Sequence, residues 1–190
     1  HGVFLIADEI ATGFGRTGTL FAFEQAGVMP DLMCVSKGLT GGFLPLAAVL
    51  TTQQIYEGFL DDSRERAFLH SHSYSGNPLA CAAALASLDI LEGDDVIARN
   101  HVTARTMGEL ASSFAANPLV AEVRQAGMVV AIELHPEPEN RDDGHAVEIA
   151  GRRGLRMYRT ALDHGVLLRP LGDVLYWMPP YGIDDEAIAM

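Results

Sequence analysis

Short apolar runs alternate with longer helix-like segments through the first half of the chain. The apolar runs span residues 3–7, 32–36 and 46–52. Continuous apolar runs of this length are typical of parallel strands that are buried on both faces. The pattern therefore predicts an α/β fold built on a mostly parallel sheet.

The clearest helix signal lies in the middle of the chain. Asn77 suits an N-cap, Pro78 suits the first helical position, and Gly93 follows a run rich in small residues. These residues predict a helix that begins at Pro78 and ends near Gly93. A second helix is predicted over residues 94–116, before an Asn-Pro pair that favours its end.

Shorter elements follow the second helix. Residues 122–134 predict one strand, and residues 145–164 predict a helix that Gly165 closes. Two apolar runs on either side of residues 171–173 predict a hairpin. A last helix is expected to start after Asp184, because acidic residues occupy its first turn.

These elements suggest two domains with a boundary near Asn117. Residues 1–117 are predicted to form part of a large α/β domain, and residues 118–190 a smaller α+β domain. The chain opens with His1 leading straight into an apolar strand and stops just inside its last helix. We therefore expect a fragment of a longer protein.

Composition narrows the function classes. The chain has 13 basic and 25 acidic residues and a net charge of −12, with no cluster of basic residues, which argues against a nucleic-acid-binding protein. Cys34 and Cys81 lie in apolar contexts and form no disulfide framework. No apolar run reaches the ~18 residues of a membrane-spanning helix. We expect a globular protein of the cytoplasm.

The loop at residues 13–18 has the spacing G-x-G-x-x-G, which also occurs in dinucleotide-binding sites. In those sites the glycines follow the strand almost directly, and an acidic residue ends the next strand. Here Asp8 and Glu9 stand between the strand and Gly13, and Asp31 precedes the next strand. The order of residues therefore argues against a dinucleotide site.

Two ionisable residues mark the ends of neighbouring predicted strands. Asp8 ends the first strand, and Lys37 follows the second, directly before the glycine-containing residues 38–42. Ligands of open α/β sheets bind beyond these strand ends. A lysine partly removed from water can attack a carbonyl as the neutral amine, because its pKa is lowered. An ion pair or a solvated strand end stays open as the alternative for each residue.

The stretch "IADEIATGFGRTGTLFAFEQAGVMPDLMCVSKGLTGG" resembles the class III pyridoxal phosphate-dependent aminotransferases. The acidic residue, the G-F-G-R-T-G loop, the P-D pair and the S-K-G triplet occur in the order typical of that family. The resemblance covers nearly the whole chain. It implies fold type I, in which a large, mostly parallel-sheet domain precedes a small α+β domain.

The resemblance also implies roles for several residues. Lys37 would form the Schiff base with pyridoxal 5'-phosphate and move the substrate proton, and Asp8 would pair with the pyridine nitrogen. Ser73 would contact the phosphate of the partner subunit's cofactor, which implies a homodimer with shared active sites. The segment before His1 is expected to hold the main phosphate-binding loop and the aromatic residue that stacks on the ring.

Two further candidates lie near the end of the chain. The resemblance implies that Arg169 clamps the carboxylate of the substrate, for which a guanidinium is suited. A surface or dimer ion pair is the alternative. Tyr176 either lines the substrate site or packs in the core.

Within the family, the residues Ile10 and Ala11 favour a subgroup whose members take part in biotin synthesis. The resemblance to this subgroup implies a keto acid as the substrate and S-adenosylmethionine as the amino donor. Ser71, His72 and Ser73 depart from that subgroup, which more often has glycine, proline and threonine. His70 and His72 form an H-x-H pair, but no third ligand is apparent, so no metal site is predicted. The alternatives are another class III omega-aminotransferase and a non-catalytic protein of the same fold.

Overall fold

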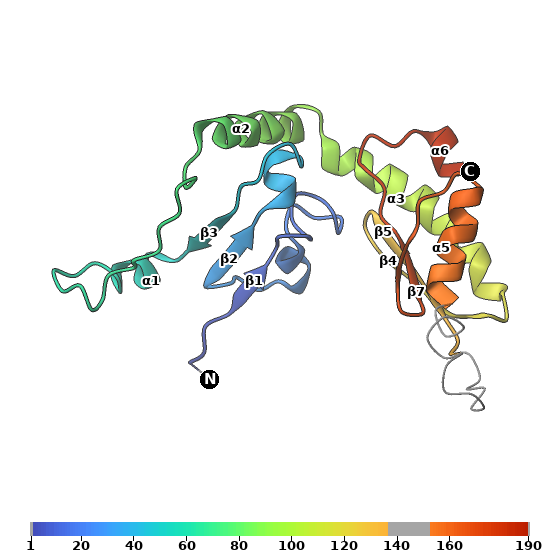
Figure 1. Ribbon diagram of the computed structural model, residues 1–190, viewed down its shortest axis with the longest axis horizontal. Coiled ribbons are helices and arrows are strands. Elements are labelled where there is room, and N and C mark those ends of the chain that lie inside the picture. The colour runs from blue at the N-terminus through green and yellow to red at the C-terminus, as the bar shows by residue number, and fades with distance from the viewer. Residues whose placement is uncertain (1, 137–152, 190) are drawn as a thin grey trace. The chain divides into compact units, whose positions relative to one another are not determined.

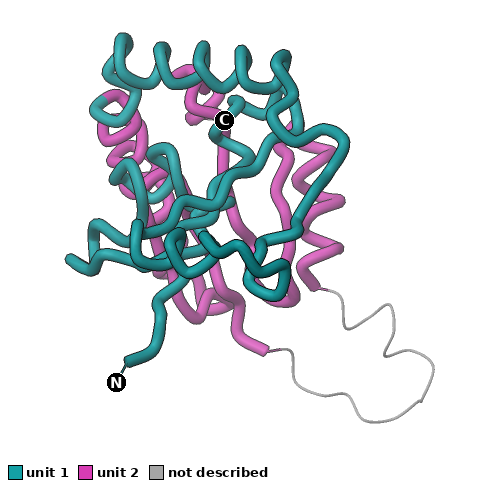
Figure 2. The backbone as a smooth tube through the Cα atoms, turned by 90° about the vertical axis from the view of Figure 1, so that its left-hand side faces the viewer, with its two compact units in different colours: residues 1–98 teal, residues 99–190 magenta. Residues whose placement is uncertain are grey.

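The computed structural model describes residues 2–136 and 153–189. The chain divides into two compact units, His1–Ala98 and Arg99–Met190, coloured separately in Figure 2. This division falls inside helix α3 (Val96–Ser112). The predicted domains, 1–117 and 118–190, stay a prediction about the organisation of the whole protein.

Unit 1 contains a three-stranded sheet of order β1-β2-β3 (Figure 1). Its strands are β1 (Ile6–Asp8), β2 (Leu32–Val35) and β3 (Ala48–Thr51). Strands β1 and β2 are parallel, with Asp8 opposite Cys34. Strands β2 and β3 fall within their predicted apolar runs, and β1 overlaps the first run and extends one residue past it to Asp8. A parallel pair is present as expected for an α/β fold.

Strand β3 corrects one expectation, because it runs antiparallel to β2. Parallel neighbours need a crossover of a dozen or more residues, usually a helix. Here the connection holds only the short 3-10 helix η2 (Lys37–Thr40) and a reversal in which Gly41 and Gly42 have φ of 60° and 82°. These left-handed glycines turn the chain back beside β2.

The predicted helix after Asn77 is confirmed as α2 (Pro78–Gly93). The Asn77 Oδ1 atom accepts hydrogen bonds from the backbone N–H groups of Leu79 at 2.9 Å and Ala80 at 3.3 Å. These two donors belong to the first helical turn, where no intrahelical acceptor is available. Helix α2 packs against η2, the turn that carries Lys37. Unit 1 also contains the short helices η1 (Ala22–Ala26) and α1 (Gln53–Glu57).

The helix predicted over residues 94–116 is present as α3, which continues into the 3-10 helix η3 (Ser113–Ala116). The helix predicted over residues 145–164 is observed in part as α5 (Arg153–Asp163), and residues 145–152 lie outside the described residues. The last predicted helix is α6 (Asp185–Ala189). Its Ala187 N–H donates to the Asp184 carboxylate at 2.7 Å.

Unit 2 contains an antiparallel sheet of order β4-β5-β7-β6. Its strands are β4 (Val120–Ala126), β5 (Val129–Leu134), β6 (Arg169–Leu171) and β7 (Val174–Trp177). The β6–β7 hairpin confirms the prediction around residues 171–173. The prediction of a single strand over residues 122–134 is wrong, because Gly127 adopts a φ of 53° and turns the chain into a second strand.

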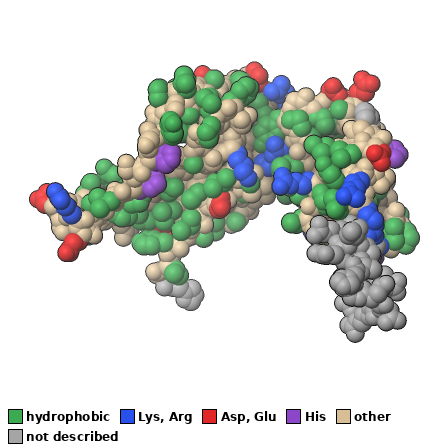
Figure 3. Space-filling view, viewed as in Figure 1, with side chains coloured by type: hydrophobic (Ala, Val, Ile, Leu, Met, Phe, Trp, Pro, Cys, Tyr) green, Lys and Arg blue, Asp and Glu red, His purple; other side chains and the backbone are tan. Residues whose placement is uncertain are grey.

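The buried core of unit 2 lies between α3, β5 and α6. It consists of Ala104, Met107, Ala111, Met128, Val130 and Ile188. In unit 1, by contrast, all four residues of β3 are exposed. Hydrophobic side chains are common across the face of the molecule seen in Figure 3. None of the helices in the described residues is long and apolar enough to cross a membrane.

Candidate active site

The parallel pairing of β1 and β2 brings Asp8 and Lys37 to one edge of the sheet. Strand β1 ends at Asp8, and Lys37 begins two residues after β2 ends at Val35. Because Asp8 is opposite Cys34, Lys37 follows three residues farther along the chain, in the turn after β2. An acid and an amine therefore stand beyond the same strand ends, as the sequence predicted.

Lys37 has an unusual backbone conformation, with a φ of 38°. A residue with a side chain rarely adopts such an angle unless the surroundings hold it there. The Lys37 carbonyl accepts a hydrogen bond from Gly42 N–H at 3.2 Å. The Ser36 hydroxyl donates to the Leu46 carbonyl and the Thr40 hydroxyl to the Leu44 carbonyl, each at 2.6 Å. The turn around Lys37 is thus fixed by its neighbours on both sides.

Lys37 is also the only lysine in the sequence, since the other twelve of the 13 basic residues are arginines. The sequence analysis did not use this signal. A chain that carries all its other positive charge on arginine has one side chain suited to Schiff-base chemistry. The sequence argument for Lys37 also invoked partial burial, but Lys37 and Asp8 are both exposed in this chain. Any burial of the pair must come from a ligand or from further protein.

Glu9, beside Asp8, is a site residue that the sequence analysis did not assign. Its side chain is only 2% exposed. One carboxylate oxygen accepts the backbone N–H of Phe23 at 2.9 Å, and the other accepts the Thr12 hydroxyl. Successive residues of a strand point to opposite faces, so one of two adjacent acidic residues at a strand end is expected to be buried. Here Glu9 is the buried residue and Asp8 is exposed to solvent.

The glycine loop after Glu9 uses its backbone donors internally. Gly13 N–H donates to the Glu9 carbonyl at 3.0 Å, Gly15 N–H to Leu20 at 3.2 Å, and Gly18 N–H to Gly15 at 3.2 Å. A dinucleotide-binding loop keeps such donors for a pyrophosphate. The hydrogen bonds therefore agree with the sequence argument against a dinucleotide site.

Ser73 lies in an exposed turn between α1 and α2, close before the start of α2. The sequence argument used the free N–H groups of that helix start, but Asn77 already accepts two of them. In the same loop His72 Nδ1 accepts the Tyr74 N–H at 3.2 Å, and the rings of Phe68 and His70 lie 5.7 Å apart. The role of Ser73 stays a prediction.

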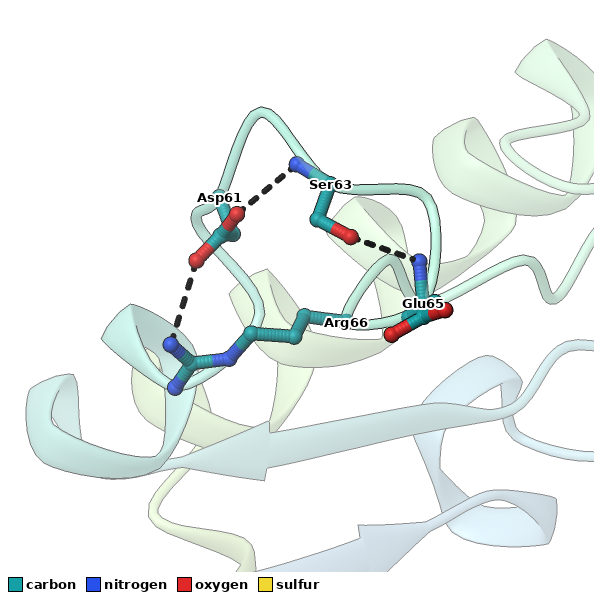
Figure 4. Close-up of polar contacts among 4 residues, drawn as sticks. All are labelled: Asp61, Ser63, Glu65 and Arg66. Atoms are coloured by element: carbon teal, nitrogen blue, oxygen red, sulfur yellow. Dashed lines mark hydrogen bonds and ion pairs between the residues drawn. The ribbon is translucent and has the colours of Figure 1, made fainter.

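Earlier in this segment, polar contacts hold a second turn (Figure 4). The Asp61 carboxylate accepts the Ser63 N–H at 2.7 Å and pairs with the Arg66 guanidinium at 3.1 Å. The Ser63 hydroxyl accepts the Glu65 N–H at 3.3 Å. Among the described residues, no group of three or more His, Cys, Asp or Glu side chains is arranged to hold a metal ion.

Arg169 and Tyr176 lie in unit 2 and are brought together by strand pairing. They are directly opposite each other on β6 and β7, so their side chains project from the same face of the sheet. Arg169 is exposed and Tyr176 is partly buried. This pairing was not foreseen from the sequence, which treated the two residues separately.

The family model described as aminotransferase class III matches residues 1–190. The chain belongs to the class III aminotransferases. Its mixed helix-and-sheet fold agrees with the PLP-dependent fold type I that the sequence predicted.

Two curated class III relatives carry the same name, adenosylmethionine-8-amino-7-oxononanoate aminotransferase. The protein of Nitratidesulfovibrio vulgaris is 46% identical over 99% of this chain and 34% of its own length. That of Geobacter sulfurreducens is 43% identical over 99% of this chain and 41% of its own length. The chain thus spans about two fifths of the curated relatives it matches.

Solved structures that resemble this chain are also aminotransferases. The crystal structure of the Methanocaldococcus jannaschii enzyme of that name superposes with a TM-score of 0.87 at 37% identity, covering 98% of this chain and 43% of that chain. An omega transaminase from Pseudomonas jessenii in complex with PMP has a TM-score of 0.85 at 32% identity, covering 98% of this chain and 41% of that chain.

Proposed function

We propose that the whole protein is a pyridoxal phosphate-dependent aminotransferase that converts 8-amino-7-oxononanoate to 7,8-diaminononanoate in biotin synthesis, with S-adenosylmethionine as the amino donor. The observation that carries this proposal is the placement of Asp8 and Lys37 beyond neighbouring parallel strands. The curated relatives at 43–46% identity support the choice of substrate through their name.

The side chains of Lys37 and Asp8 fit pyridoxal phosphate. A pyridine aldehyde requires an amine for its carbonyl carbon and a carboxylate for its ring nitrogen. Lys37 and Asp8 supply these two groups at one sheet edge. When bound, pyridoxal phosphate supplies an electron sink for the charge that develops on the substrate carbon.

In this proposal the chain's own residues hold and move protons. The Asp8 carboxylate keeps a proton on the ring nitrogen, because the attraction between opposite charges favours the protonated ring. The Lys37 amine would take the proton from the substrate carbon and deliver it to the cofactor's C4′ carbon, so that the amino group stays with the cofactor. The fixed turn around Lys37 limits the positions that this amine can reach.

Ser73, Arg169 and Tyr176 complete the proposed site. The Ser73 hydroxyl would bind the cofactor phosphate of a second subunit, Arg169 would pair with the substrate carboxylate, and Tyr176 would pack beside it. The cross-strand pairing of Arg169 and Tyr176 supports their joint role.

We also propose a homodimer that acts in the cytoplasm. The α1–α2 segment, which holds Ser73, exposes several large apolar side chains, and such side chains are commonly covered by a partner. They are Phe59, Leu60, Phe68, Leu69 and Tyr74. Cys34 and Cys81 are free, which agrees with a reducing compartment.

The test uses the full-length protein loaded with pyridoxal phosphate. Borohydride should fix the cofactor irreversibly to Lys37, and peptide mass spectrometry should find the label there; Lys37→Arg, which keeps the charge, should carry no label. Formation of diaminononanoate should then be measured with S-adenosylmethionine and with other amines. Labelling at another lysine would overturn the site, and turnover of unrelated omega-amino substrates alone would favour the omega transaminase alternative.

A further inference from the structure

The loop of residues 13–18 has no chemical role in the proposed reaction, although it lies between the two site residues. Its second residue, Phe14, is only 6% exposed and has a φ of 59°, a left-handed angle that a side chain disfavours. A strained backbone angle of this kind is kept only where the surrounding structure holds it. At Phe14, this angle fixes the direction in which the ring points.

The Phe14 ring packs directly against Gly38, the residue after Lys37. A Cβ atom added to Gly38 would lie 2.8 Å from Phe14 Cδ2 and 3.2 Å from Phe14 Cγ. Only a glycine allows the ring to approach the backbone this closely. The glycine loop and the Lys37 turn are therefore in direct contact.

The carbonyl of Gly38 is held as well. The Ser87 hydroxyl of α2 donates to the Gly38 carbonyl at 3.2 Å. Gly41 N–H donates to the same carbonyl at 3.0 Å. The backbone next to Lys37 thus contacts both the Phe14 ring and a side chain of α2.

Phe14 is itself fixed by the strand that carries Asp8. Its ring meets Phe21 edge-on, with centroids 5.6 Å apart, and Phe21 stacks on Phe23 at 5.8 Å. The buried Glu9 accepts the Phe23 N–H, and the Glu9 N–H donates to Cys34 of β2 at 2.9 Å. A continuous set of contacts leads from the end of β1 to the backbone of Lys37.

We propose that Phe14 is a positioning residue for Lys37. Its ring holds Gly38 and so keeps the Lys37 backbone in the left-handed conformation that sets where the amine lies relative to Asp8. The G-F-G-R-T-G loop then serves as a spacer between acid and amine and needs no ligand of its own. This inference rests on the proposed function for its catalytic consequence, but the contact is a property of the chain itself.

The test compares Phe14→Leu and Gly38→Ala in the full-length protein with Phe4→Leu as the matched control. The control makes an identical change in unit 1 on a ring that is 67% exposed and lies outside the Phe14–Phe21–Phe23 contacts. Amide hydrogen exchange is measured for residues 36–42 without cofactor. We expect exchange there to rise about tenfold or more in Phe14→Leu and Gly38→Ala, and to stay near the wild-type rate in Phe4→Leu. Equal exchange in Phe14→Leu and Phe4→Leu would overturn the proposal.

A second measurement separates positioning from general loss of stability. With cofactor bound, Phe14→Leu should lower kcat about 10- to 100-fold while KM for the keto acid changes little, because a misplaced amine impairs proton transfer and not binding. Gly38→Ala should lower kcat by a smaller factor when it is made in the Phe14→Ala variant than when it is made in the wild-type protein. In the variant, the ring that the new methyl group would meet is gone. Additive losses would overturn the proposal.

These outcomes stay distinguishable from failure of the proposed function. If borohydride does not label Lys37 in the wild-type protein, the assignment of function fails. The exchange comparison needs no cofactor and still decides whether Phe14 fixes the Lys37 turn.

Discussion

The two units of the chain use their apolar residues differently. In unit 2, Met107 and Met128 are fully buried and Val130 is 1% exposed, within a core shared by α3, β5 and α6. In unit 1, Val49 of β3 is 62% exposed and Leu50 is 49% exposed. Unit 2 therefore closes a core of its own, whereas the sheet of unit 1 leaves apolar side chains open.

Unit 1 also carries a group of polar and strained residues around Asp8 and Lys37. It consists of a buried carboxylate, hydroxyls that donate to backbone carbonyls, and two left-handed residues with side chains. The left-handed residues cost stability and are kept where the surroundings fix the backbone. The backbone around Lys37 in unit 1 is thus fixed by local contacts, while unit 2 presents the Arg169–Tyr176 pair on a sheet that packs on a buried core. In the proposed function, unit 1 would hold the two reacting groups in place and unit 2 would support the Arg169–Tyr176 face.

The largest effect should follow from opening the core of unit 2. Met107→Ala in the full-length protein should destabilise unit 2 by about 2–5 kcal/mol, because it removes a fully buried side chain and leaves a cavity. Hydrogen exchange of the β5 amides should report the loss. Val102→Ala on the same helix is the control, since Val102 is 63% exposed and its change should alter stability by less than about 0.5 kcal/mol. Equal losses would mean that the core described for unit 2 does not hold it together.

The second prediction concerns the acid of unit 1. Asp8→Asn should leave the fold and cofactor binding intact, because Asp8 is exposed, while the transamination half-reactions slow by about 10²- to 10³-fold. An amide cannot balance the charge on the ring nitrogen. Single-turnover spectroscopy of each half-reaction provides the measurement. A near-normal rate would mean that another residue is the functional acid. The proposal that unit 1 holds both reacting groups would then be wrong.

The smallest effect tests whether unit 2 also takes part in binding. Arg169→Ala should raise KM for the keto acid about 10- to 100-fold with a smaller change in kcat, because a charge-assisted bidentate contact is lost from ground and transition states alike. Arg169→Lys should recover only part of the loss, since an ammonium lacks the planar fork. Steady-state kinetics at matched folded fraction, with Arg156→Ala as a surface control, decide the matter. Unchanged KM would leave Arg169 with a structural role alone.

Much of the fold could be predicted from local signals. Helix α2 was found because Asn77 and Pro78 act through adjacent backbone groups, and the β6–β7 hairpin because its strands flank a glycine turn. The β4–β5 hairpin was missed, since a single Gly127 inside an apolar run is a weak turn signal. The direction of β3 was missed because an apolar run carries no information on which way its partner runs.

The candidate site shows the same limit. Asp8 and Lys37 could be found from their places after apolar runs, since strand ends are local features. The contact of Phe14 with Gly38 could not, because it joins residues whose approach depends on the parallel pairing of two strands. The inward turn of Glu9 depends on the burial of one sheet face, and the pairing of Arg169 with Tyr176 depends on strand register.

Strand β3 has a consequence for how the protein is made in a cell. In the described part of the chain it pairs with β2 alone, and its residues Ala48–Thr51 are uncharged and exposed. An uncharged open strand edge can pair with other chains, and natural proteins commonly guard such edges with charged residues or proline. As long as this edge stays uncovered during folding, the protein is therefore expected to be prone to aggregation, and its yield on overexpression should depend on temperature and on chaperone supply.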